Sequence, residues 1–170
     1  MLREDETIRL AQLARSLPKP EPTKFAYIPV ALHEKTAYLA GQIPKHDGAL
    51  AHCGLVGDQI SIEEAKSAAC ICAEQALSWF NHQAGGLENM SRILRLTYFI
   101  AHSDGFEGIS EVADAASEYL VEVLGEIGNH SRSVIGVRSL PRNAPVLIEM
   151  TVALRQPIPE ELSGTGISSA

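Results

Sequence analysis

Residues 61–86 read SIEEAKSAACICAEQALSWFNHQAGG, and this stretch carries the clearest local signal in the 170-residue chain. Ser61 followed by Glu64 is a capping-box pattern, because the hydroxyl accepts a hydrogen bond from a first-turn amide while the carboxylate reaches back. Small or apolar residues then recur every three or four positions: Ile62, Ala65, Ala69, Cys72, Ala76 and Phe80. The pattern predicts a long helix that starts at Ser61, ends at Gly85-Gly86 and packs one small-residue face on a sheet.

The segments before this helix predict a short helix and three strands. Apolar residues at helical spacing over Thr7–Leu17 indicate the helix, which the prolines at 18, 20 and 22 then end. Two apolar runs, Phe25–Leu32 and Thr36–Ala40, flank a polar turn and predict an antiparallel hairpin. His46-Asp47-Gly48 predicts a second turn, which leads into a weaker strand around Ala49–Leu55.

The segments after the long helix predict one more helix and three more strands. Ile93–Ala101 is rich in aromatic and β-branched residues, as strands are. A helical stripe over Ile109–Val123 stops before Gly125, and the strands Arg132–Val137 and Val146–Leu154 follow. This order predicts an α+β domain in which two long helices cover one face of a mixed six-stranded sheet, with a short N-terminal helix added.

The predicted organisation is a single domain with two appendages. Residues 1–22 are expected to form the N-terminal helix and an extended linker, residues 23–156 the domain, and residues 157–170 a flexible tail rich in Ser and Gly. Apolar residues are expected on both faces of the strands: Val30, Leu39, Val134, Val146 and Ile148. Because helices cover only one face, the other predicts association with further copies of the chain.

Composition excludes several classes of function. A formal charge of −7, with no cluster of basic and aromatic residues, argues against nucleic acid as a partner. No apolar run approaches the ~20 residues that span a bilayer, and the acidic N-terminus lacks the features of a secretory signal, so a cytoplasmic protein without a membrane partner is expected. The six histidines show no ligand spacing and no glycine-rich phosphate loop is present, so neither a metal nor a cofactor is predicted.

Arg132 is the residue most suggestive of a small-molecule site. It follows a glycine-containing loop and stands at the start of a predicted strand, where alternation places Val134 and Gly136 on the same face. A guanidinium beside a small apolar floor suits a carboxylate, which it binds with two parallel hydrogen bonds. The residues alone leave a second interpretation equally open, in which Arg132 pairs with a structural acid such as Glu149.

Motifs spread along the chain favour the first interpretation. They occur in this order: Tyr27, Ala40-Gly41-Gln42-Ile43-Pro44, Gly57, Glu64, Ser131-Arg132-Ser133, Leu140-Pro141 and Ile148-Glu149. Together they resemble the RidA/YjgF family, also labelled endoribonuclease L-PSP or translation inhibitor. The resemblance covers about residues 20–154, and the extended N-terminus is similar to a longer subgroup of that family.

The resemblance implies a chorismate-mutase-like (YjgF) fold and a homotrimer, with ligand clefts between subunits. Characterised members hydrolyse reactive enamine and imine intermediates to 2-keto acids and ammonia. By position, Arg132 matches the carboxylate-binding arginine, Gly41 a residue whose backbone lines the cleft, and Tyr27 the cleft tyrosine. The expected partners are therefore further copies of this chain and a small carboxylate or imino acid.

Three positions depart from the deaminating members that this chain resembles. Val134 stands where many have a cysteine, Leu147 where they have the acid that helps to place the attacking water, and Asp114 where an asparagine is common. Glu149 follows Leu147 by two residues on the same strand face and offers a replacement acid. Two hypotheses follow: an enamine/imine deaminase (a hydrolase), or a non-catalytic or regulatory member that binds a small carboxylate. The acidic charge and the lack of a histidine pair argue against ribonuclease activity.

Overall fold

The computed structural model describes residues 4–159. Its elements are, in order, α1 (Glu4–Ser16), β1 (Val30–His33), β2 (Thr36–Gln42), β3 (Lys45–His46), β4 (Ala49–Leu50), α2 (Ile62–Gln83), β5 (Met90–Ala101), α3 (Ile109–Leu124), β6 (Ser131–Val137) and β7 (Val146–Leu154). Short 3-10 turns lie at Leu87–Asn89, Gly125–Gly128 and Pro141–Asn143. The α+β class and the short N-terminal helix are confirmed.

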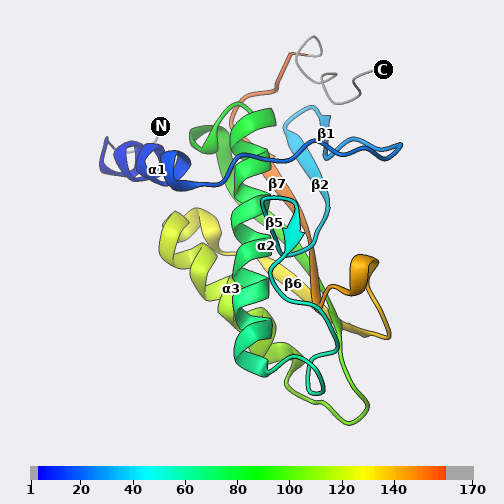
Figure 1. Cartoon of the computed structure of the whole chain (residues 1–170). Coiled ribbons are helices and arrows are strands. Elements are labelled where there is room, and N and C mark those ends of the chain that lie inside the picture. Colours follow the sequence, from blue (N-terminus) through cyan, green and yellow to red (C-terminus); the bar gives the residue numbers. More distant parts are fainter. Residues whose placement is uncertain (1–3, 160–170) are drawn as a thin grey trace.

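The main sheet has the strand order β1-β2-β7-β5-β6. The pair β5 and β6 is parallel, and the other neighbours are antiparallel. Helices α2 and α3 lie together on one face of this sheet (Figure 1). Among residues 4–159, helices cover one face of the sheet, the covered face, and none lies on the other, the open face.

The long helix α2 begins as its sequence predicts. The Ser61 hydroxyl accepts from the Glu64 amide at 3.2 Å, and the Glu64 carboxylate accepts from the Ser61 amide at 2.9 Å. Five alanines of the helix have no exposed surface: Ala65, Ala68, Ala69, Ala73 and Ala76. Their small side chains let the helix backbone lie close to the sheet, and burial of the apolar surface between them stabilises the fold.

In the described part of the chain, the main sheet has five strands rather than the predicted six. The segment predicted to supply the third strand instead forms a separate two-stranded hairpin, β3 with β4. Its turn residues Asp47 and Gly48 have φ angles of 49° and 79°, the left-handed pair that a tight hairpin turn requires. Beyond β4, positive φ values of 126° at Gly54 and 86° at Gly57 bend the chain out of the extended conformation. The predicted strand over 49–55 therefore stops at Leu50.

The first strand is also shorter than its sequence predicts. Phe25 to Tyr27 form a bend, Phe25 to Ile28 are exposed to solvent, and the strand begins only at Val30. Pro29 has no amide hydrogen, so the ladder to β2 cannot extend through its nitrogen, although its carbonyl still accepts from Ala40 at 2.9 Å. The apolar character of this run therefore belongs to a surface segment.

The open face of the sheet is apolar, but through residues other than those predicted. Strand register places Val30, Leu39, Val134, Val146 and Ile148 all on the covered face. The open face instead carries Tyr38, which is 49% exposed, and Ile135, which is 41% exposed. Phe99 lies on the same face, paired with Ile135 on one side and with Leu147 on the other. The expectation of an uncovered apolar sheet face thus holds.

Helix α1 is tied to the end of α3. Leu10 is buried, and the Arg9 guanidinium donates from Nη2 to the Leu124 carbonyl at 2.8 Å. A cation at this position satisfies a terminal carbonyl and complements the negative end of the helix dipole. Within residues 4–159 no helix is both long and apolar enough to cross a membrane. Most of the predicted tail, from residue 160 on, lies outside the described residues.

Candidate functional site

The residues singled out by sequence separate into two groups in the structure. Arg132, Asp114 and Val134 lie where β6 meets α3, on the covered face. Tyr27, Gly41 and Leu147 line one cavity near the other end of the strand order. Glu149 belongs to neither group, because it is exposed on the open face of β7, opposite Thr97 of β5.

Arg132 is held by two residues of α3. Its Nη2 donates to Asp114 Oδ1 at 2.5 Å, and its Nη1 donates to Ser117 Oγ at 3.0 Å. Asp114 and Ser117 are three residues apart, so one turn of α3 presents both side chains to the same strand. Arg132 does pair with an acid, as the second interpretation holds, but the acid is Asp114 and not Glu149.

The Ser117 hydroxyl is the centre of a hydrogen-bond network. It lies 3.0 Å from the Tyr98 hydroxyl and 3.1 Å from His130 Nε2, in addition to its contact with Arg132. His130 Nδ1 lies 2.7 Å from the Gly128 carbonyl, which only accepts, so Nδ1 carries the proton of the neutral ring. Ser117 must then donate to His130 Nε2 and accept from Arg132 and Tyr98.

The pKa shifts of His130 and Tyr98 agree with these donors and acceptors. Burial lowers the pKa of His130 below its ordinary value of 6.5, and the positive charge of Arg132 lowers it further, against the opposing effect of the Gly128 carbonyl. Burial raises the pKa of Tyr98 to about 12, so its hydroxyl stays protonated. At neutral pH the network therefore holds a neutral imidazole and a neutral phenol.

The pair of Arg132 and Asp114 is weak enough to be displaced. The Arg132 side chain is 28% exposed and that of Asp114 is 51% exposed. Ion pairs in contact with water contribute about 0.2–1 kcal/mol. A ligand carboxylate that bound the guanidinium through two hydrogen bonds would compete with Asp114, while Ser117 kept the guanidinium in place.

Val134 packs against the hydrophobic core and does not line the cavity that contains Tyr27. Its register partner is Tyr98, so the side chain points toward α3 in the same direction as Arg132. Val134 therefore lies on the same face of β6 as Arg132, and its role as an apolar floor for a ligand stays a prediction.

The second group lines a cavity of about 470 Å³, within the usual range for small-molecule sites. Its wall includes the exposed rings of Phe25 and Tyr27, which stack with centroids 6.3 Å apart and planes 6° from parallel. Trp79 of α2 also lines it. The cavity is called here the Tyr27 cavity.

Gly41 and Leu147 form the floor of the Tyr27 cavity. Gly41 lies at an irregularity in the pairing of β2 with β7, between Leu39 and Gln42. A Cβ atom at position 41 would lie 2.6 Å from Leu147 Cδ2, so a larger residue there would force the Leu147 side chain to move. Leu147 thus covers the backbone of Gly41 with an apolar group.

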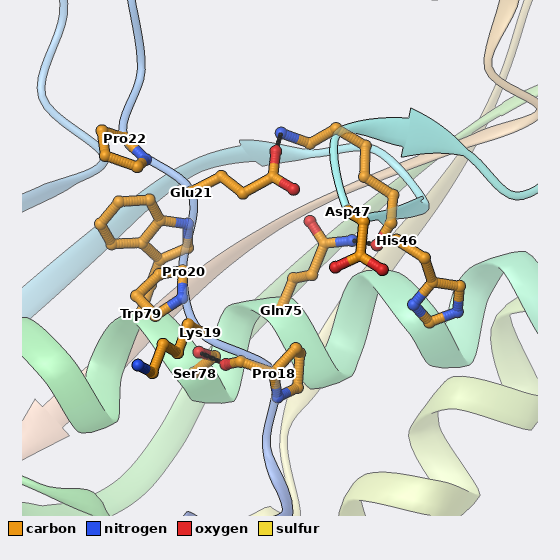
Figure 2. A pocket seen from close by; sticks show the side chains of 11 residues that line it. Pro18, Lys19, Pro20, Glu21, Pro22, His46, Asp47, Gln75, Ser78 and Trp79 are labelled. Carbon is orange, nitrogen blue, oxygen red and sulfur yellow. Dashed lines mark hydrogen bonds and ion pairs between the residues drawn. The ribbon is translucent and has the colours of Figure 1, made fainter.

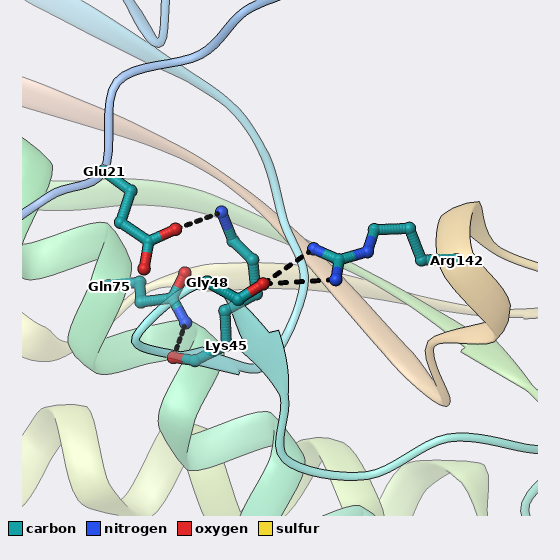
Figure 3. A network of polar contacts seen from close by, with 5 residues as sticks. All are labelled: Glu21, Lys45, Gly48, Gln75 and Arg142. Atoms are coloured by element: carbon teal, nitrogen blue, oxygen red, sulfur yellow. Dashed lines mark hydrogen bonds and ion pairs between the residues drawn. The ribbon is translucent and has the colours of Figure 1, made fainter.

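A polar network borders this cavity (Figure 3). Lys45 Nζ donates to Glu21 Oε2 at 3.3 Å, and Gln75 Nε2 donates to the Lys45 carbonyl at 2.7 Å. Arg142 donates from both Nη1 and Nη2 to the Gly48 carbonyl, each at 3.1 Å. These bonds fix the β3-β4 hairpin between α2 and the loop that precedes β7.

A neighbouring cavity of about 430 Å³ lies beneath the segment that follows α1. Figure 2 shows the prolines at 18, 20 and 22 passing over Ser78 and Trp79 of α2. The Ser78 hydroxyl donates to the Pro18 carbonyl, which ties the segment to the helix. This segment leads directly to Phe25 and Tyr27, so it helps to position the wall of the Tyr27 cavity.

Comparison with known proteins assigns the family. Residues 8–154 match the family described as "YjgF/chorismate mutase-like, putative endoribonuclease". This chain belongs to the RidA/YjgF family. The match covers both groups of candidate residues, from Tyr27 to Leu147, and all the strands of the main sheet.

Individual relatives of this RidA/YjgF chain share most of its length. Protein TCP17 of Trypanosoma cruzi is 31% identical over 146 residues, which are 85% of this chain and 91% of that protein. The crystal structure of Atu1372 from Agrobacterium tumefaciens, a protein of unknown function, is 33% identical with a TM-score of 0.77, covering 88% of this chain and 91% of that one. A "putative endoribonuclease" from Shewanella oneidensis is 24% identical with a TM-score of 0.81, covering 88% and 99%, and shows the shared fold.

Several residues of this RidA/YjgF site were not predicted. Tyr98, His130 and Arg132 each contact the Ser117 hydroxyl, and Arg142 lines the Tyr27 cavity. The spacing of Asp114 and Ser117 on a predicted helix was the available signal for the first set. Arg142 had none, because its contact with Gly48 joins residues 94 positions apart.

Proposed function

We propose that this chain hydrolyses reactive enamine and imine intermediates to 2-keto acids and ammonia, with Arg132 binding the substrate carboxylate. The observation that carries the proposal is the arrangement around Arg132, where Ser117 accepts from Nη1 and orients the guanidinium, while the exposed Asp114 accepts from Nη2. A small anion is the ligand that such a partly exposed guanidinium suits best.

The proposal requires more than one subunit. Arg132 is on the covered face of β6, whereas Gly41 and Leu147 are on the open face of β2 and β7. With neighbouring strands about 4.8 Å apart, β6 lies roughly 14 Å from β2, on the far side of β7 and β5. The two groups therefore cannot hold one small molecule within a single chain.

A homotrimer with clefts between subunits would bring the groups together. The apolar open face, with Tyr38 and Ile135 exposed, needs a covering partner. Strand β6 is an edge strand without a single buried residue, so it is free to meet a neighbour. We propose that Arg132 of one subunit completes the Tyr27 cavity of the next.

The catalytic hypothesis predicts that release of 2-keto acid and ammonia from freshly generated imino acids falls sharply in Arg132→Ala. Arg138→Ala is the matched control, because it removes the same charge from a neighbouring exposed position. Equal rates in Arg132→Ala and wild type would exclude the assignment.

The shared cleft has a separate test. Chains carrying Arg132→Ala and chains carrying Tyr27→Ala are each expected to be inactive alone. In mixed trimers some clefts combine the intact Arg132 of one chain with the intact Tyr27 of the other, so co-expression should restore part of the activity. No recovery in mixtures that demonstrably form mixed trimers would exclude a site made by two subunits.

One observation favours the alternative, a non-catalytic or regulatory member that binds a small carboxylate. Leu147 stands at the position of the family's acid and covers Gly41. The one carboxylate among the residues that line the Tyr27 cavity is that of Glu21, and it is paired with Lys45. Imine hydrolysis needs a group that donates a proton to nitrogen. A calorimetric titration that shows Arg132-dependent binding of 2-oxobutanoate, together with no turnover, would decide for this alternative.

A further inference from the structure

The Tyr27 cavity is positively charged in a protein whose formal charge is −7. Three cationic side chains line it, Lys24, Lys45 and Arg142, against one carboxylate, Glu21. Lys45 is neutralised by Glu21 at 3.3 Å, whereas Lys24 and Arg142 form no ion pair with any acid among residues 4–159. The cavity therefore keeps two uncompensated positive charges.

Of the two unpaired cations, Lys24 and Arg142, it is Arg142 whose side chain is held in place. It and Asn143 have φ angles of 60° and 63°, a conformation that costs a non-glycine residue energy and that recurs at binding sites. The Gly48 carbonyl accepts from both Nη1 and Nη2 and so holds the guanidinium over the hairpin. Only two of the five guanidinium hydrogens are used there, which leaves three for an anion. Figure 3 shows the side chain reaching from its loop to Gly48.

The rest of the cavity is suited to a hydrocarbon chain. Leu147, Ile43 and the stacked rings of Phe25 and Tyr27 provide apolar surface in the same cavity as the Arg142 guanidinium. A ligand that lies along this surface would have its far end near Arg142. Its near end would be at the mouth that the neighbouring Arg132 completes.

We infer that the ligand of this cleft is a dicarboxylate, whose second acidic group is bound by Arg142. The inference rests on the proposed function for the position of the first carboxylate, at Arg132. It adds the chemical class of the substrate: 2-imino acids with an acidic side chain, and the corresponding 2-keto dicarboxylates as products.

The test compares two probes that differ only at the far end. 2-Oxoglutarate carries a carboxylate where 2-oxopentanoate carries a methyl group. Calorimetric titration of the wild-type protein should show about tenfold tighter binding of 2-oxoglutarate, a difference of about 1.4 kcal/mol. The preference should disappear in Arg142→Gln, which removes the positive charge but keeps a polar side chain with hydrogen-bond donors. Arg138→Gln is the matched control and should keep the preference, because Arg138 lines a different cavity beside His102.

Equal binding of the two probes by the wild-type protein, a preference that survives Arg142→Gln, or no binding of either probe would each overturn the inference. The same proteins are also assayed with imino acids generated from glutamate and from norvaline. Arg132-dependent turnover without discrimination between these substrates would leave the proposed function intact and overturn the dicarboxylate. Binding of 2-oxoglutarate that depends on both Arg132 and Arg142, without turnover of any imino acid, would support the dicarboxylate ligand and exclude the proposed hydrolysis.

Discussion

Replacement of Ser117 by alanine tests the network that holds Arg132. The substitution removes one hydroxyl that donates to His130 and accepts from Arg132 and Tyr98. Tyr98 is fully buried, so its own hydroxyl would lose its partner in a place that water does not reach. Arg132 would keep only its contact with the exposed Asp114.

The expected loss of stability follows from these contacts. A buried hydroxyl left without a partner costs about 1–3 kcal/mol, whereas the half-buried His130 and the partly exposed Arg132 recover hydration and add less. We expect Ser117→Ala to lower the free energy of unfolding by about 2 kcal/mol. Tyr98→Phe in the same background removes the unsatisfied hydroxyl, so the double variant should be no less stable than Ser117→Ala alone.

Urea denaturation of the wild type, both single variants and the double variant measures these quantities. Ser110→Ala is the control, because Ser110 is exposed on the same helix. A loss below about 0.5 kcal/mol in Ser117→Ala, within the range of ordinary surface substitutions, would refute the network as described. So would additive effects of the Ser117 and Tyr98 substitutions, since residues in contact must show coupling.

Three further predictions concern other parts of the fold. Gly41→Ala should destabilise by about 1–3 kcal/mol in chemical denaturation, since its Cβ would lie 2.6 Å from Leu147. The cost should be smaller in a Leu147→Ala background, and an equal cost in both backgrounds would contradict this contact. The pKa of His130 is lower in the folded chain than its ordinary 6.5, so the unfolded state binds more protons as the pH falls through 6.5. The free energy of unfolding should therefore decrease in that pH range, and the decrease should be smaller in His130→Gln. An identical pH profile for the two proteins would contradict this. Arg9→Ala should cost about 1 kcal/mol by uncapping the Leu124 carbonyl, and an unchanged unfolding midpoint would show that the contact is dispensable.

Local chemistry made much of the fold predictable. The capping box at Ser61 and the glycines after Ala84 set the limits of α2, and the stripe over Ile109–Val123 located α3 within a residue. The last two strands were also located within one residue. Each of these signals depends on residues within a few positions of one another, so it can be recognised in the sequence alone.

The positions of β3 and β4 show the limit of such signals. The turn at Asp47-Gly48 was correctly located, but the strand after it does not join the main sheet. Whether a short apolar run pairs with a particular sheet depends on the space that other elements leave, which local pattern does not encode.

By itself the sequence determined the type and order of the main elements, the RidA/YjgF membership, and Arg132 as a candidate anchor. Tertiary structure alone decided that Arg132 faces α3, where Ser117 and His130 surround it, and that Tyr27 and Gly41 lie in a separate cavity with Arg142. The physical reason is range: periodicity and capping act within a few residues along the chain. The partners of Arg132 and Arg142 are instead set by which faces of distant strands and helices pack together.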